Sequence, residues 1–233
     1  MPLWLRYTQF LVKSRCDIVA HSTLPASRTK PQRTSRRAKD PAPRAWQRML
    51  SGRRLDLLDP AAIDIEIDDI ALGLSRVARW NGQTQGEHGF SVAQHSLIVE
   101  DICAVIRPQL SVPHRLMALL HDAPEYVIGD MISPFKAALG LDYKRFEANL
   151  EQAIHIRFGL PAVMPADIKV LIKQADHACA YFEATQLVGF SEQEARLYFG
   201  EPPAGYDLCL VPLAPTVASE QFVARFTELM QKL

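Results

Sequence analysis

The chain has few cysteines and no long apolar run, and these two absences exclude several classes of protein. Its 233 residues include only four cysteines, none in a CxxC pair, so neither a disulfide framework nor a zinc knuckle is predicted. No uninterrupted apolar stretch approaches the ~20 residues that a bilayer-spanning helix needs. We therefore expect a protein without a membrane partner, in the reducing environment of the cytoplasm.

A net charge is also lacking, but the charges are unevenly distributed. Residues 1–40 carry nine Lys or Arg against Asp17 and Asp40, which leaves seven acidic charges in excess over residues 41–233. The first 43 residues are rich in Ser, Thr, Pro and Arg, and such a composition buries too little apolar surface to offset its ordering entropy. We interpret residues 1–43 as a basic, disordered extension. It is either a dispensable terminus, an arm for nucleic acid, or an organelle presequence.

Helical periodicity dominates the rest of the chain. Apolar residues make up 48% of the sequence, enough for the core of one domain over residues 44–233. Apolar stripes at i, i+3 and i+4 spacing predict a succession of helices. Ile63, Ile65 and Ile67 instead alternate with acidic residues, as in a half-buried strand. The predicted fold class is all-α, a helical bundle that can also include a small β-hairpin near residues 53–67.

A histidine occupies an interior-looking position on one of these helices. Ser91 begins a capping box, and His95 follows one turn later. Its side chain is predicted to face the apolar side of the helix rather than the charged side that carries Glu100 and Asp101. A buried polar side chain needs a partner, which is either an ordinary core hydrogen bond or a metal ion.

An aspartate occupies a similar position on the most apolar helix. Asp176 lies beside small apolar residues, where a carboxylate is unfavourable unless it is paired or metal-bound. A solvated position is the alternative, because Lys169, Lys173 and Glu183 indicate that this helix also has a wet side.

An adjacent histidine and aspartate end another apolar run. Neighbouring residues on a helix point about 100° apart, so His121 and Asp122 can reach one ion only where the helix ends. Pro124 provides that ending, since it disfavours helical backbone angles at Ala123. Imidazole nitrogen and carboxylate oxygen together suit Mn, Fe, Co, Ni or Zn better than Ca.

The order of these ligand-type residues resembles that of the HD-domain metal-dependent phosphohydrolases. Further motifs accompany them in sequence: Arg79-Trp80, Ser-Val-Ala-Gln-His95, His121-Asp122-Ala-Pro-Glu125, Gly129-Asp130, Ser-Pro-Phe-Lys136, Tyr143-Lys144 and Gln174-Ala-Asp176. In this order and spacing they resemble the YfbR-like 5′-deoxynucleotidase subgroup over about residues 70–185. The resemblance implies an HD-domain helical bundle and a phosphohydrolase activity.

The resemblance also implies a metal site and a set of catalytic residues. One divalent ion, which would be Mn, Co, Fe, Ni, Mg or Zn, is expected on His95, His121, Asp122 and Asp176. Glu125 is implied as the general acid or water-orienting residue, and Asp130 as the residue that positions the attacking water or the leaving 5′-oxygen. Both acids could instead be solvated loop residues.

The implied substrate is a 5′-(deoxy)nucleoside monophosphate, hydrolysed to nucleoside and phosphate. Arg79 would bind its phosphate, while Trp80 would pack near the sugar and disfavour a 2′-hydroxyl. Lys136 and Lys144 are candidates for extra phosphates, which leaves a nucleoside triphosphate as an alternative substrate. A helix-terminal cation and a core tryptophan are the alternative interpretations of Arg79 and Trp80.

Other features leave the choice of function open. The loop after Trp80 differs from that of the deoxynucleotidases, and His88 within it has no assigned partner. His155 is the only further histidine between the His-Asp pair and Asp176, which favours one metal ion over two. A metal- and nucleotide-binding sensor without catalysis is a second alternative. Nucleic acid is an unlikely partner because the domain is acidic, whereas the apolar faces of the terminal helices would permit a homodimer.

Overall fold

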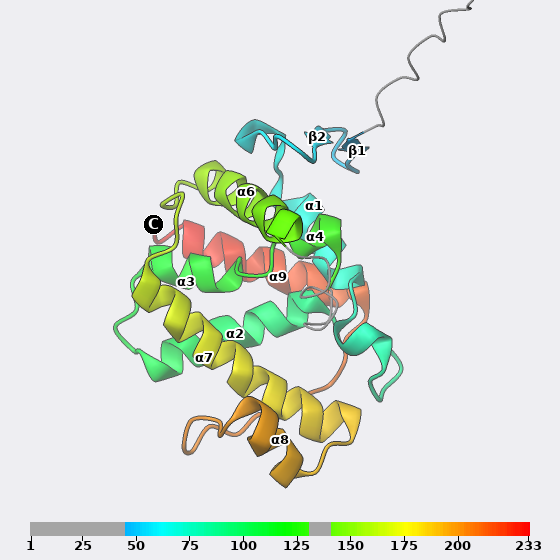
Figure 1. Cartoon of the computed structure of the whole chain (residues 1–233), viewed down its shortest axis with the longest axis vertical. Helices are drawn as coiled ribbons and strands as arrows, with labels where there is room; N and C mark the ends of the chain where they lie inside the picture. Colours follow the sequence, from blue (N-terminus) through cyan, green and yellow to red (C-terminus); the bar gives the residue numbers. More distant parts are fainter. Residues whose placement is uncertain (1–44, 131–140) are drawn as a thin grey trace, which may run out of the picture. The chain divides into compact units, whose positions relative to one another are not determined.

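Helix α2 (Val92–Ile106) packs against helices from several other parts of the chain. The computed structural model describes residues 45–130 and 141–233, which belong to one compact unit, Pro43–Leu233. The predicted extension, residues 1–43, lies outside the described residues. The helices that contact α2 are α1 (Ile67–Arg76), α3 (Val112–Leu119), α7 (Ala166–Glu183) and α9 (Pro215–Met230) (Figure 1).

Shorter elements and one further long helix complete the described fold. They are the 3-10 helix η1 (Ala62–Asp64), the turn η2 (Arg79–Gly82), α4 (Glu125–Ile128), α6 (Leu141–Arg157) and α8 (Glu192–Phe199). A π-helical segment, η3 (Ala184–Val188), continues α7 at its end. The prediction of an all-α fold class is confirmed. Among the described residues, no helix has both the length and the apolarity that a membrane crossing requires.

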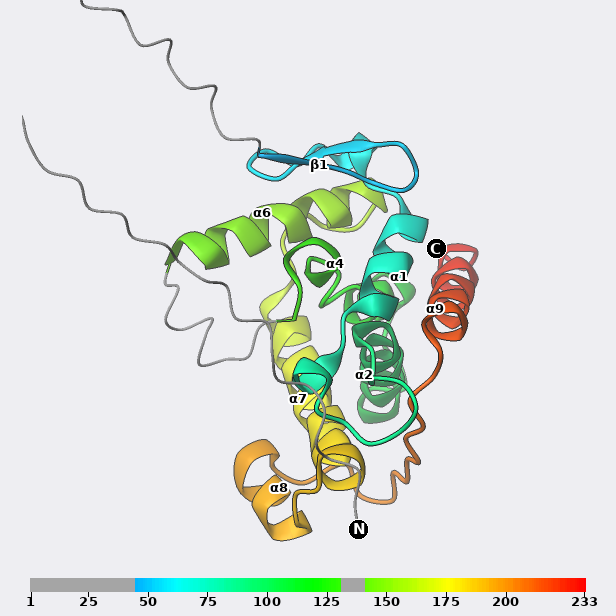
Figure 2. The same cartoon turned by 90° about the vertical axis from the view of Figure 1, so that its right-hand side faces the viewer.

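The core forms around α2 because that helix is apolar on more than one side. Val99, Ile102 and Cys103 are fully buried and join one cluster with apolar residues of α1, α3, α7 and α9. Figure 2 shows α2 between α7 on one side and α9 on the other. A polar residue of α2 that points into this core is therefore removed from water.

A small hairpin is present, but its strands differ from the predicted ones. Strand β1 (Trp46–Arg48) pairs antiparallel with β2 (Arg54–Asp56). The alternating stretch Ile63–Ile67 is not a strand: its first residues form η1 and its last residue begins α1. Ile65 is fully buried while Ile63 is 67% exposed, so the alternation marks one inward-facing residue before a helix start. The strand prediction for residues 63–67 was wrong.

Two acidic residues predicted to lie on wet helix faces are fully buried, so those predictions were also wrong. The carboxylate of Glu100, on α2, lies 2.5 Å from Arg115 Nε and 2.9 Å from Arg225 Nε. These guanidinium groups compensate the charge that burial would otherwise make unfavourable. The second residue, Glu183, is the last residue of α7 and contacts the site described below.

Candidate metal centre

The segment after α1 leaves the helical path before Arg79. Helix α1 ends at Arg76, and Ala78 then pairs with Ser91 in an isolated antiparallel bridge. Trp80 and Asn81 adopt left-handed backbone angles, with φ of 56° and 51°. Arg79 therefore lies beyond the helix end, and the alternative interpretation of Arg79 as a helix-terminal cation was wrong. The turn places Arg79 and Trp80 beside the start of α2.

His95 lies in the first turn of α2 and is fully buried. The Ser91 hydroxyl accepts a hydrogen bond from the Gln94 backbone N–H at 3.3 Å, which caps this helix as the sequence predicted. The Nε2 atom of His95 lies 3.3 Å from Asp176 Oδ1 and 3.5 Å from Asp122 Oδ2. The interior position predicted for His95 is confirmed by this burial, and two of the predicted ligands face it.

His121 and Asp122 lie in the break between α3 and α4. Helix α3 ends at Leu119, and Pro124 precedes the short helix α4. His121 Nε2 is 3.2 Å from Asp122 Oδ2, and the rings of His95 and His121 are 5.4 Å apart. One ligand atom from each of His95, His121 and Asp122 lies within 4.8 Å of the others. That spacing is close to the span of ligands that share one ion at ~2.1 Å each.

Asp176 belongs to the same region but is less central. It is partly exposed, and its second carboxylate oxygen lies 3.0 Å from Lys173 Nζ on the same helix. It is close to His95, but it is not among the residues whose ligand atoms all lie within 4.8 Å of one another. One oxygen of Asp176 therefore faces the cluster and the other faces a solvated lysine, and its role as a metal ligand stays a prediction.

The ring nitrogens indicate what kind of ligand fits between these residues. His95 Nδ1 is 2.6 Å from Glu183 Oε1, and His121 Nδ1 is 2.9 Å from the Ala118 carbonyl. Both partners are acceptors, so Nδ1 carries the proton in each neutral ring. Each Nε2 is buried and makes no hydrogen bond, and in a neutral ring its lone pair faces carboxylate oxygens. A cation between them converts this repulsion into coordination, so the donor set fits a divalent metal ion.

The electrostatics of the cluster also favour a positive charge at its centre. Burial raises the pKa of Asp122 and of Asp176, but the charges of His95 and His121 outweigh it and hold both pKa values well below their ordinary range. Burial and the charge of Arg79 lower the pKa of His95, but Cys179, Glu183 and the hydrogen bond of Asp176 outweigh them and hold it well above its ordinary value. A proton on a histidine ring and a bound metal ion would each supply this positive charge.

The structure adds Glu183, which sequence reasoning did not select. The Glu183 carboxylate contacts His95, accepts from Trp80 Nε1 at 2.6 Å and from the Cys179 thiol at 3.3 Å, and lies 3.3 Å from Arg79 Nε. Burial raises its pKa, but the charges of Arg79 and His95 outweigh burial and lower it to about 2. Its position two helical turns after Asp176, on the same face, was the available signal.

The remaining predicted site residues fall into two groups. Near the cluster, Glu125 is buried at the start of α4, and Asp130 Oδ2 lies 3.6 Å from Arg79 Nη1. Away from it, Lys144 is exposed on α6, and Lys136 lies outside the described residues. The structure therefore gathers Arg79, Trp80 and Asp130 around the cluster and leaves Lys144 as a solvated cation.

Two other histidines lie apart from the cluster. His155 is buried in α6 with its Nδ1 atom 3.1 Å from the Pro161 carbonyl, and burial lowers its pKa. His88 is half-buried in the loop after η2. Neither belongs to the groups of metal-ligand type found among the described residues, and the single ion stays a prediction.

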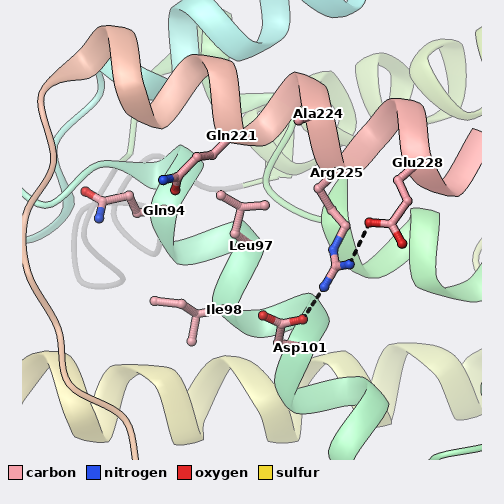
Figure 3. Close-up of a pocket in the computed structure, with 8 residues that line it drawn as sticks. All are labelled: Gln94, Leu97, Ile98, Asp101, Gln221, Ala224, Arg225 and Glu228. Carbon is pink, nitrogen blue, oxygen red and sulfur yellow. Dashed lines mark hydrogen bonds and ion pairs between the residues drawn. The ribbon is translucent and has the colours of Figure 1, made fainter.

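A groove of about 400 Å³ lies elsewhere, between α2 and α9. It is lined by Gln94, Leu97, Ile98, Asp101, Gln221, Ala224, Arg225 and Glu228 (Figure 3). Arg225 pairs there with Asp101 and, at 3.0 Å, with Glu228. None of the predicted site residues lines this groove, so the histidine and carboxylate cluster is the candidate site.

Fold and cluster together describe a mostly helical protein with a candidate divalent-metal centre. The uncharacterized protein RCAP_rcc00048 of Rhodobacter capsulatus is 55% identical over 194 residues, which cover 82% of this chain and 98% of that protein. The uncharacterized protein YfdR of Escherichia coli is 34% identical over 168 residues, which cover 72% of this chain and 86% of that protein. No family model matches the chain. The chain belongs to the family that these two proteins represent.

Proposed function

We propose that this protein is an HD-type metal-dependent phosphohydrolase that acts on 5′-(deoxy)nucleoside monophosphates. The observation that carries the proposal is the pair of buried Nε2 atoms, of His95 and His121, that make no hydrogen bond and lie within 3.5 Å of Asp122 Oδ2. Their order along the chain, with Asp176 last, is that of the resemblance described above. Two imidazoles and two carboxylates would hold one divalent ion and leave coordination positions for other ligands.

When bound, the ion would supply a water of lowered pKa and neutralise charge on the phosphoryl group. The protein residues would position the substrate around it. Arg79 is a partly buried cation between Glu183 and Asp130, placed to bind a phosphate that approaches the cluster. Glu125, buried at the start of α4, would orient a water or protonate the leaving oxygen. Asp130 would position the attacking water or the leaving 5′-oxygen.

A monophosphate is preferred over a triphosphate on the basis of charge. Each added phosphate needs further cations for neutralisation. Lys144, one of the two lysines suggested for that role, is exposed on α6. In the part of the chain that the structure describes, the cations that contact the cluster residues are Arg79 and Lys173. Triphosphate hydrolysis and metal-dependent sensing remain the alternatives that the experiment below separates.

We further propose that the protein works in the cytoplasm. Cys103 and Cys179 are free and buried, and Cys209 is free and exposed, as expected of a reducing compartment. A homodimer through the apolar faces of the terminal helices is proposed as well. Light scattering of the purified protein would test the dimer, since a mass near 26.1 kDa would contradict it.

Phosphate release from a substrate panel tests the proposed function. The metal-stripped protein is assayed with 5′-dNMPs, 5′-NMPs, dNTPs and an aryl phosphate, each with EDTA, Mn²⁺, Co²⁺ or Mg²⁺. We expect metal-dependent phosphate release from monophosphates, lost with EDTA and in His121→Ala. In Glu125→Gln we expect a fall of about 10²–10⁴-fold in turnover at full metal occupancy. Tripolyphosphate release from dNTPs alone would assign the alternative enzyme, and inactivity of the metal-loaded protein would favour the sensor.

A further inference from the structure

The two oxygens of the Glu183 carboxylate face different parts of the site. Oε1 lies 2.6 Å from Nδ1 of His95, the ring that belongs to the candidate metal centre. Oε2 accepts the indole N–H of Trp80 at 2.6 Å and lies 3.3 Å from Arg79 Nε. This fully buried side chain therefore joins the metal centre to the turn η2.

The turn that Glu183 contacts has an unfavourable backbone. Trp80 and Asn81 both adopt left-handed angles, which bulky residues adopt only when their surroundings hold them there. The side-chain contacts of Trp80 include its indole N–H bond to Glu183 and two ring contacts, of 6.0 Å with Phe190 and 5.9 Å with Phe199. The hydrogen bond is the polar, directional one of the three.

We propose that Glu183 is a positioning residue that links metal binding to the conformation of the Arg79–Trp80 turn. Through Oε1 it keeps the proton of His95 on Nδ1 and turns Nε2 toward Asp122 and Asp176. Through Oε2 it holds the turn in its left-handed form. The role of the turn in substrate binding rests on the proposed function, whereas the two contacts of Glu183 do not.

The substitution Glu183→Gln would distinguish this positioning role from simple packing. His95 Nδ1–H, Trp80 Nε1–H and Arg79 are all donors toward Glu183, but a glutamine amide has one oxygen and one NH₂ group. Its NH₂ group must therefore face a donor. If it faces His95, the ring proton moves to Nε2 and blocks the metal; if it faces Trp80, the turn loses its hydrogen bond.

Mn²⁺ affinity, measured by calorimetry, is the first readout. We expect Glu183→Gln to bind Mn²⁺ about 10–100-fold more weakly than the wild type, as loss of an orienting partner typically does. Cys179→Ala is the matched control, because it also alters a buried side chain that contacts Glu183 but leaves the carboxylate in place. Its affinity should stay within about threefold of wild type. Glu183→Asp keeps the charge and both acceptors, so it should fall between the wild type and Glu183→Gln.

Trp80 emission is the second readout and needs no metal. The Trp80 signal is obtained by difference between chains with Trp80 and with Trp80→Phe, in both the wild-type and the Glu183→Gln backgrounds. We expect the emission of Trp80 to shift in Glu183→Gln because its N–H loses the carboxylate. The same shift should be absent in Cys179→Ala.

The outcomes separate this proposal from the proposed function. Wild-type affinity in Glu183→Gln, or an equal loss in Cys179→Ala, would overturn the positioning role while metal binding stands. A wild-type chain that binds no Mn²⁺ would instead end the proposed function, and unchanged Trp80 emission in Glu183→Gln would then overturn the positioning role too. Should Glu183→Gln not fold, Glu183→Asp with wild-type affinity and wild-type emission would also overturn it.

Discussion

Helix α2 carries a fully buried histidine, His95, and a fully buried glutamate, Glu100, whose surroundings have opposite charge balances. Glu100 meets two guanidinium groups, those of Arg115 on α3 and Arg225 on α9. His95 meets three carboxylates, on Asp122, Asp176 and Glu183. The first cluster compensates its buried charge with protein groups alone. The second cluster holds more carboxylates than cations, so a bound positive ion would stabilise it.

The difference shows that burial of a polar residue does not by itself identify a binding site. Glu100 is as deeply buried as His95, but its interactions are those of a structural ion pair that joins three helices. His95 and His121 each have one nitrogen paired and the other facing anions. Charge balance and the hydrogen bonding of each atom therefore distinguish the two clusters. The predictions below act on one cluster and spare the other.

The largest effect is expected from Glu100→Ala, which breaks the balanced cluster. Removing the carboxylate leaves Arg115 without its partner and takes from Arg225 its buried partner, although Arg225 still pairs with Asp101 and Glu228. Breaking a buried ion pair costs about 3–5 kcal/mol of unfolding free energy. Urea unfolding of the metal-free protein measures it. Glu228→Ala, which removes an exposed partner of Arg225, should cost less than about 1 kcal/mol. A loss below 1 kcal/mol in Glu100→Ala would contradict the structural role.

Mn²⁺ should stabilise the protein through the other cluster. At a concentration about 100 times its dissociation constant, a ligand that binds only the folded state adds about 2.7 kcal/mol to the unfolding free energy. We expect this increment in the wild type and in Glu100→Ala, with reversal by EDTA. Asp122→Asn should show none of it. The same increment in Asp122→Asn would place the ion elsewhere.

Gly73→Ala perturbs the helix that supports one side of the candidate site. A Cβ atom at Gly73 would lie 2.7 Å from Tyr126 Cβ and 2.9 Å from the Tyr126 carbonyl oxygen, on α4 beside Glu125. We expect a loss of about 1–3 kcal/mol from overpacking and weaker catalysis at unchanged Mn²⁺ affinity. The sign of the change in unfolding free energy tests the close contact with Tyr126, because Ala in an unhindered helix would instead stabilise it by about 1 kcal/mol.

The smallest effect on stability is expected from Asp122→Asn without metal. The substitution removes a carboxylate whose pKa the histidine charges lower, which costs stability. It also relieves repulsion in a cluster with an excess of carboxylates, two of which still face His95. We expect the unfolding free energy of the metal-free protein to change by less than about 1 kcal/mol, as is usual where a site is built for binding rather than stability. A loss as large as that of Glu100→Ala would make this cluster structural as well.

Much of the site was predictable because its signals are local in sequence. Ser91 caps α2 and thereby fixes the face on which His95 lies, and Pro124 marks the break that brings His121 and Asp122 together. The helical fold class followed from periodicity in the same way. These features depend on residues within one or two helical turns of each other, where spacing determines geometry.

The errors concern features that depend on distant partners. Glu183 and Glu100 resemble solvated acids because the residues that bury and compensate them are far away; His95 is 88 residues from Glu183. The strand predicted at Ile63–Ile67 failed for a related reason: β2 already pairs with β1, and alternation alone does not supply another partner. The left-handed turn at Trp80 was also missed, because tertiary contacts rather than residue type hold it.

Equilibrium dialysis of Mn²⁺ against the metal-free wild type and His121→Ala tests the central claim most directly. Helix content of both proteins is checked first by circular dichroism, because His121 lies between two helices. We expect the wild type to bind one ion per chain, and His121→Ala to bind it at least about 100-fold more weakly because one of its ligands is gone. No bound ion in the wild type, or equal affinity in the two proteins, would contradict the account.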